Sequence, residues 1–203
     1  MRDQFSFLGI RSPERVALTK AFIKEYGTPE GDNLQAAVLE LWRLPEREFH
    51  YTAMVLLEKK KKKSELSRID LLEQLVVDNS WWDTVDFLAS HLIGAQFTLF
   101  PELIPSYTQR WIESDNMWLQ RTAILFQLGY KKRTDTDLLW SFIRHTADSK
   151  EFFIRKAIGW ALREYSKTDE AAVRRFLDET QLSPLSVKEA LKFVERSTLR
   201  LEH

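Results

Sequence analysis

One helical pattern built around a small residue recurs five times along the chain and limits the fold more than any other feature. The segments YTAMVLL, DTVDFLA, RTAILFQL, RKAIGWAL and KEALKFV share the apolar spacing of one helix face. Their matching positions follow at intervals of 32, 38, 34 and 33 residues: Ala53, Val85, Ala123, Ala157 and Ala190. Helical hairpins repeated at this period cannot bury their apolar faces alone, so we expect them to stack into an all-α solenoid.

The remaining sequence also favours helices, because helical periodicity fills the chain between short turn signals and no strand pattern stands out. The predicted helices span residues 12–26, 32–44, 46–59, 64–77, 80–93, 101–113, 117–128, 136–146, 151–165, 169–179 and 186–196. Gly27, Gly94 and Gly129 are predicted to end three of them. The repeat interval is slightly below the roughly 40 residues of HEAT repeats, so we predict HEAT-like helical-hairpin repeats. We assign residues 1–200 to a single domain, and residues 201–203 resemble an expression-tag remnant.

Composition excludes several classes of function. With 30 basic and 30 acidic residues the formal net charge is zero, so nucleic-acid binding would require an uneven distribution of charge. The chain has no cysteine, which excludes disulfides, thiolate zinc sites, iron–sulfur clusters and a cysteine nucleophile. No apolar run approaches the roughly 18 residues of a membrane span, and the histidines lack metal-ligand spacing. We therefore expect a monomeric, cytoplasmic protein without a metal, a cofactor or a membrane partner.

Three residues separated by whole repeats are the first candidates for a functional site. Trp82, Arg121 and Trp160 follow one another at intervals of 39 residues, each within a helical segment of similar pattern. Residues one repeat apart stack in a line on one surface of a helical array, so these three should line a single face. Asp86 follows Trp82 by one helical turn. Together they would form a groove able to grip a nucleic-acid backbone and act on a sugar.

Asp86 has two interpretations. It lies well inside its predicted helix, too deep to cap it, among apolar neighbours: Trp82, Ala89 and Ile93. A carboxylate there costs stability unless it is paired or partly solvated, so Asp86 is either a functional group or half of a buried ion pair. The nearby Asp83 has a structural interpretation, because Ser80 and Asp83 have the spacing of a helix capping box.

The basic residues of the same face also have two interpretations each. Arg121 has apolar helical neighbours, so it either binds phosphate or forms a salt bridge between repeats, for which Asp86 is one possible partner. Lys156, Trp160 and Arg163 follow one another at four and three residues and form a basic, aromatic stripe. The stripe either packs on a sugar with phosphate at the cations, or is a cation–π decoration of the helix.

The motifs around these residues carry a family resemblance. FSFLGIRSPER from Phe5, SWWDTVDFLASHLIG from Ser80, WLQRTAILFQLGY from Trp118 and FIRKAIGWALREY from Phe153 resemble the DNA alkylation repair family of AlkD type. The resemblance spans residues 5–196 and implies a C-shaped solenoid of HEAT-like repeats with a concave DNA-binding groove. Family members usually carry a further N-terminal helical segment before the FLGI motif, whereas this sequence begins almost at that motif.

The resemblance also implies an activity and a role for each site residue. Family members are DNA glycosylases that remove purines alkylated at N3 or N7 from duplex DNA. By motif, the catalytic aspartate corresponds to Asp86, the two groove tryptophans to Trp82 and Trp160, and the arginine to Arg121. No lysine is implied as a nucleophile, so we expect a monofunctional glycosylase. The alternative is a non-catalytic helical-repeat scaffold that binds DNA or protein through its concave face.

Overall fold

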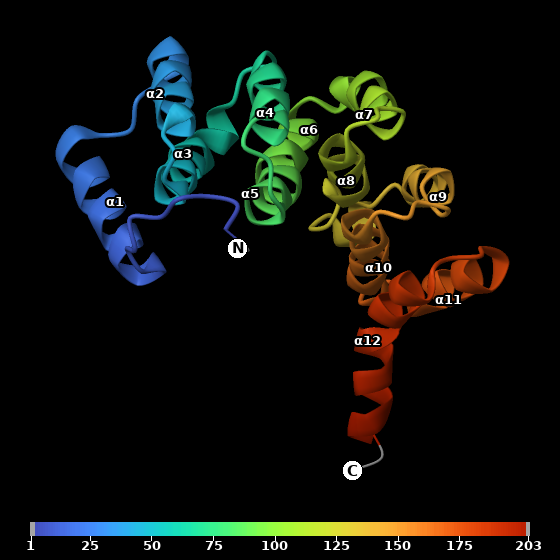
Figure 1. Ribbon diagram of the computed structural model, residues 1–203. Coiled ribbons are helices and arrows are strands. Elements are labelled where there is room, and N and C mark those ends of the chain that lie inside the picture. The colour runs from blue at the N-terminus through green and yellow to red at the C-terminus, as the bar shows by residue number, and fades with distance from the viewer. Residues whose placement is uncertain (1–2, 202–203) are drawn as a thin grey trace. The chain divides into compact units, whose positions relative to one another are not determined.

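The computed structural model describes the backbone of residues 3–201 and the side chains of residues 3–193, and it is built of helices (Figure 1). The chain divides between Ser80 and Trp81 into two compact units. The first contains α1 (Ser12–Tyr26), α2 (Gly31–Arg43), α3 (Arg47–Lys60), a 3-10 turn (Lys61–Lys63) and α4 (Arg68–Val77). The second contains α5 (Trp82–Phe87), a π-helical turn (Leu88–Ile93), α6 (Gly94–Leu99), a 3-10 turn (Pro101–Leu103), α7 (Ile104–Ile112), α8 (Met117–Leu125), a 3-10 turn (Lys131–Arg133), α9 (Thr136–His145), α10 (Phe152–Ser166), α11 (Glu170–Glu179) and α12 (Pro184–Leu201).

The first unit is built around the packed pair α2 and α3. Glu48 at the start of α3 is buried, and its carboxylate accepts backbone N–H groups from Leu8, Gly9 and Ile10 at 3.1–3.3 Å. Three such hydrogen bonds compensate the loss of water around the charge and fix the FLGI loop to the helix.

The second unit stacks the second helices of successive hairpins. In chain order, α5 packs on α8, α8 packs on α10, and α10 packs on α12. The repeat positions of these four helices, Val85, Ala123, Ala157 and Ala190, are at most 1% exposed, so the repeat derived from the sequence marks their contact side. Ala53, the repeat position in α3 of the first unit, is also fully buried. The prediction of an all-helical repeat fold is confirmed, whereas the single domain over residues 1–200 stays a prediction.

Two predicted helix ends are wrong. The helix predicted for residues 117–128, before Gly129, ends at Leu125 and is followed by turns. The helix predicted for residues 80–93 was expected to end at Gly94, but Gly94 begins α6 with ordinary helical backbone angles and the chain stays helical to Leu99. A side chain at Gly94 would place its Cβ 2.5 Å from the carbonyl oxygen of Phe126. Glycine is therefore required there by close packing and not by helix termination. Gly27, by contrast, ends α1 with a positive φ of 80°, as predicted.

Two further sequence expectations concern membranes and the C-terminus. Over the described residues no single helix is long and apolar enough to span a membrane; only the bent pair Trp82–Leu99 and Pro101–Ile112 meets the criteria of length and composition. The suspected tag remnant, residues 201–203, lies outside the side chains that the structure describes.

Candidate functional site

All six residues singled out in the sequence line one open groove of about 400 Å³ in the second unit. The helices α5, α8 and α10, which follow one another in the stack, supply them. The predicted residues in the lining are Trp82, Asp86, Arg121, Lys156, Trp160 and Arg163, and the added ones are Phe152, Phe153 and Glu189. The repeat spacing therefore placed residues from three different helices on one surface.

The start of α5 differs from the capping box predicted for it. The N-cap position is Trp81, which makes no capping hydrogen bond with its side chain, and the Ser80 hydroxyl donates instead to the carbonyls of Val76 and Val77. Trp81 is held by aromatic packing, with its ring 5.8 Å from that of Trp118 and 5.2 Å from that of Phe153. This packing fixes the first turn of α5, from which Trp82 points outward with 45% of its surface exposed.

Asp86 and Arg121 form a bidentate ion pair in the groove. Arg121 Nε donates to Asp86 Oδ1 at 2.7 Å, and Arg121 Nη2 donates to Oδ2 at 2.9 Å. The third nitrogen, Nη1, donates to the backbone carbonyl of Phe153. Side-chain exposure is 5% for Arg121 and 15% for Asp86, so the arginine is enclosed while the carboxylate retains an opening to the groove.

The pair agrees with the salt-bridge interpretation of Arg121, while a phosphate contact stays a prediction. All three guanidinium nitrogens already donate to protein oxygens, and the side chain is enclosed. Arg121 is therefore in position to orient the Asp86 carboxylate. Burial raises the pKa of Asp86 above the ordinary 3.8, and the hydrogen bond and charge of Arg121 oppose that rise.

Four aromatic side chains line the groove together with this pair. Trp82 and Phe152 are 45% and 57% exposed, while Trp160 and Phe153 are half-buried. The sequence carried no signal for the two phenylalanines as site residues, because aromatic residues at the start of an amphipathic helix are usually core residues. Exposed aromatic faces of this size provide flat apolar surface for packing against sugars or bases.

The basic stripe converges on a carboxylate that the sequence analysis missed. Lys156 Nζ lies 2.5 Å from Glu189 Oε2, Arg163 pairs with Glu189 Oε1, and Lys192 Nζ lies 2.7 Å from Oε2. Burial alone would raise the pKa of Glu189, but the bonds from Lys156 and Lys192 and the charge of Arg163 lower it to about 2. A signal was present: Lys156 and Glu189 each precede a small repeat position, so the repeat rule puts them side by side.

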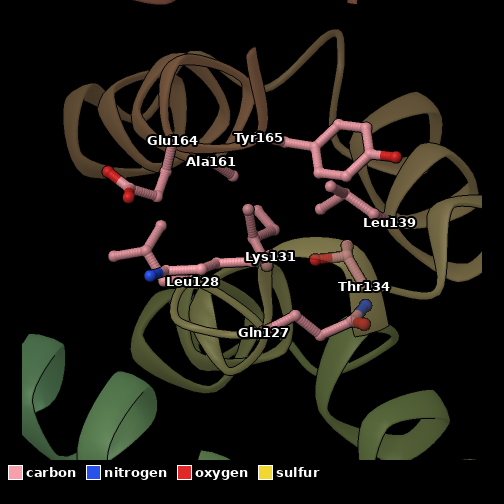
Figure 2. A pocket seen from close by; sticks show the side chains of 9 residues that line it. Gln127, Leu128, Lys131, Thr134, Leu139, Ala161, Glu164 and Tyr165 are labelled. Atoms are coloured by element: carbon pink, nitrogen blue, oxygen red, sulfur yellow. The ribbon is translucent and has the colours of Figure 1, made fainter. Parts of the chain in front are cut away.

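A second, much smaller cavity lies in the same unit and is not a candidate site. Figure 2 shows its lining, which includes Lys131, Thr134 and Tyr165. Its volume of about 20 Å³ is close to the minimum for one water molecule. Among the described side chains, no group of three or more acidic or histidine residues could hold a metal ion.

The fold and the groove define a class of protein: a helical-repeat protein with an oriented carboxylate in an aromatic, partly cationic groove. The family model for the DNA alkylation repair enzyme matches residues 1–194, and the chain belongs to that family. The resemblance inferred from the sequence is thereby confirmed. No curated protein matches the chain.

Several solved structures share the fold. A predicted DNA alkylation repair enzyme from Enterococcus faecalis has 34% sequence identity and a TM-score of 0.87, covering 95% of this chain and 90% of that one. AlkD2 from Streptococcus mutans has 17% identity and a TM-score of 0.68, covering 95% and 94%. The protein smu.31 from Streptococcus mutans UA159 has 18% identity and a TM-score of 0.66, covering 88% and 96%. The last two likenesses support the fold alone.

Proposed function

We propose that the protein is a monofunctional DNA glycosylase that hydrolyses the N-glycosidic bond of cationic N3- or N7-alkylated purines in duplex DNA. One observation carries the proposal: the Asp86 carboxylate is clamped by Arg121 and still opens onto a groove with exposed aromatic walls. A carboxylate that served only to neutralise Arg121 would need no such opening.

The chemistry of the lesion requires little more than such a carboxylate. Alkylation at N3 or N7 makes the purine a cation and a good leaving group, and its departure leaves oxocarbenium character on the deoxyribose. In the proposed reaction Asp86 stabilises that positive charge and orients a water molecule for attack at the anomeric carbon. Arg121 keeps both carboxylate oxygens in place, so the charge needs no reorganisation during bond cleavage.

The rest of the groove suits a DNA strand. Trp82 and Trp160 offer aromatic faces to the sugar-phosphate backbone, and Lys156 and Arg163 offer cations to the phosphates. One lysine, Lys156, lines the groove, and its amino group forms an ion pair with Glu189. We therefore propose direct hydrolysis by water without a Schiff-base intermediate or strand cleavage.

A non-catalytic DNA-binding scaffold would share the groove, its cations and its aromatic walls. The ion pair with Arg121 also gives Asp86 a structural use, so the presence of the carboxylate does not by itself separate the two functions. Turnover separates them, because a scaffold would bind methylated duplex DNA without releasing a base.

The test is chromatographic detection of free 7-methylguanine and 3-methyladenine after incubation with methylated duplex DNA. The wild-type protein should release both bases or one of them well above the spontaneous rate, and Asp86→Asn should reduce release by at least about 100-fold. Asp83→Asn is the matched control, since it removes the same charge from α5 at a position outside the groove lining. DNA binding without base release by the wild-type protein would establish the scaffold and refute the glycosylase.

A further inference from the structure

Glu189 connects the two cations of the groove to the helix behind it. Three positive side chains contact one carboxylate, whose exposure is 6%, so the cluster has a formal net charge of +2. Lys156 and Arg163 line the groove, whereas Lys192 does not. Glu189 therefore pairs with the Lys156 amino group and the Arg163 guanidinium, the two cations that a DNA phosphate in the groove would also bind.

The carboxylate is held in place by close packing of α12 on α10. A side chain at Gly159 would place its Cβ 2.5 Å from the Cβ of Glu189 and 2.7 Å from the carbonyl oxygen of Ser186. The Ser186 hydroxyl also donates to the carbonyl of Arg155 at 3.0 Å, which ties the two helices together. These contacts fix the backbone and the Cβ of Glu189 beside the two cations, so a phosphate that approaches them has to share them with the carboxylate.

Carboxylates and phosphates recruit the same donors by the same charge-assisted hydrogen bonds. A fixed carboxylate among phosphate-binding cations lowers the positive potential that a DNA phosphate meets, because it reduces the local positive charge by one unit. The reduced positive charge affects only contacts with DNA backbone phosphates, so it weakens binding to every DNA sequence equally.

We propose that Glu189 is a built-in competitor of the DNA phosphate, which limits non-specific affinity for undamaged duplex DNA. The proposal rests on the proposed function, because it takes DNA as the ligand of the groove. The protein should therefore dissociate readily from undamaged DNA. Its residence time on DNA should depend more on the contacts around Asp86 than on contacts with the DNA backbone.

The test is the affinity of the full chain for an undamaged duplex oligonucleotide between about 0.05 and 0.3 M salt. Glu189→Gln keeps the shape of the side chain and removes its charge. It should bind about 3–10-fold more tightly at 0.1 M salt, with a salt dependence steeper by up to about one unit of logarithmic slope. Glu170→Gln is the matched control: it makes the same charge change at an exposed pair with Arg174, outside the groove, and should leave affinity nearly unchanged.

A second variant tests whether a change in the protein's net charge or in its folding explains the tighter DNA binding. Glu189→Gln combined with Lys192→Gln retains the wild-type net charge, leaves Lys156 and Arg163 in the groove, and avoids three unneutralised cations in contact. It should also bind the undamaged duplex more tightly than the wild type. Circular dichroism and thermal melting establish that each variant is folded.

The outcomes separate this proposal from the proposed function. If the wild type binds DNA but the folded, charge-balanced variant binds no more tightly, the competitor role is overturned while the glycosylase proposal stands. Weaker binding by both variants would show that Glu189 orders the cations for DNA binding, and this result too would overturn the competitor role. A wild-type protein that does not bind duplex DNA at low salt would overturn both.

Discussion

Removing the charge of Asp86 should destabilise the protein as well as stop the reaction. Asp86→Asn leaves the Arg121 guanidinium, whose side chain is 5% exposed, with the Phe153 carbonyl as a partner but no anion. Breaking a buried pair from one side typically costs about 3–5 kcal/mol. For a chain of 203 residues each kcal/mol corresponds to roughly 2–4 °C, so the melting temperature should fall by about 6–20 °C.

Urea denaturation and calorimetry of four proteins measure this cost: the wild type, Asp86→Asn, Arg121→Gln and the double variant. The double variant should regain most of the lost stability, because no buried charge remains unpaired and two amides can bond to each other. The coupling energy of the cycle isolates the pair from other effects of each substitution. An Asp86→Asn protein with the same melting temperature as the wild type would refute the reasoning that the buried Arg121 side chain needs this carboxylate for stability.

Three other predictions concern the aromatic walls and the two carboxylates. Trp82→Ala and Trp160→Ala should each lose about 1–3 kcal/mol of DNA affinity in a binding titration, and Trp82→Ala, at a position 45% exposed, should melt close to the wild type. The proposed function makes ionised Asp86 a requirement for excision, so activity should fall as the pH drops through a pKa that burial raises above the ordinary 3.8; an acid limit at or below that value in a pH–rate profile would contradict this cause. Glu189 has a folded-state pKa of about 2, below the ordinary 4.5, so its stabilisation is complete above pH 4.5 and is lost as the pH falls toward 2. In acid melts the wild type should therefore lose about 1–3 kcal/mol across this window relative to Glu189→Gln, and parallel curves would contradict the ion cluster.

The sequence predicted those parts of the fold that depend on periodicity. The small repeat positions Ala53, Ala123 and Ala190 are buried, as their spacing indicated, because each hairpin must bury one face against its neighbours. The role of Gly94 was not predictable, since a helix-ending glycine and one required by close packing have the same signal in a sequence. The Phe126 carbonyl that requires Gly94 lies 32 residues further along the chain.

The site was predicted as a set of residues but not as a set of contacts. Repeat spacing placed Asp86 and Arg121 on one surface, yet it left open whether the guanidinium forms a salt bridge with the carboxylate or binds phosphate. That choice depends on the relative rotation of α5 and α8, which periodicity does not fix to within a hydrogen bond. Glu189 was not predicted as a site residue, although its position one repeat from Lys156 indicated their contact.

The most direct measurement of the central claim is single-turnover release of 7-methylguanine by the wild type and by the double variant Asp86→Asn, Arg121→Gln. Because the double variant has no unpaired buried charge, it should fold and bind DNA like the wild type, so any difference in rate belongs to the chemical step. We expect release to be slower by at least about 100-fold in the double variant. Equal rates for two folded, DNA-bound proteins would contradict the claim that Asp86 performs the reaction.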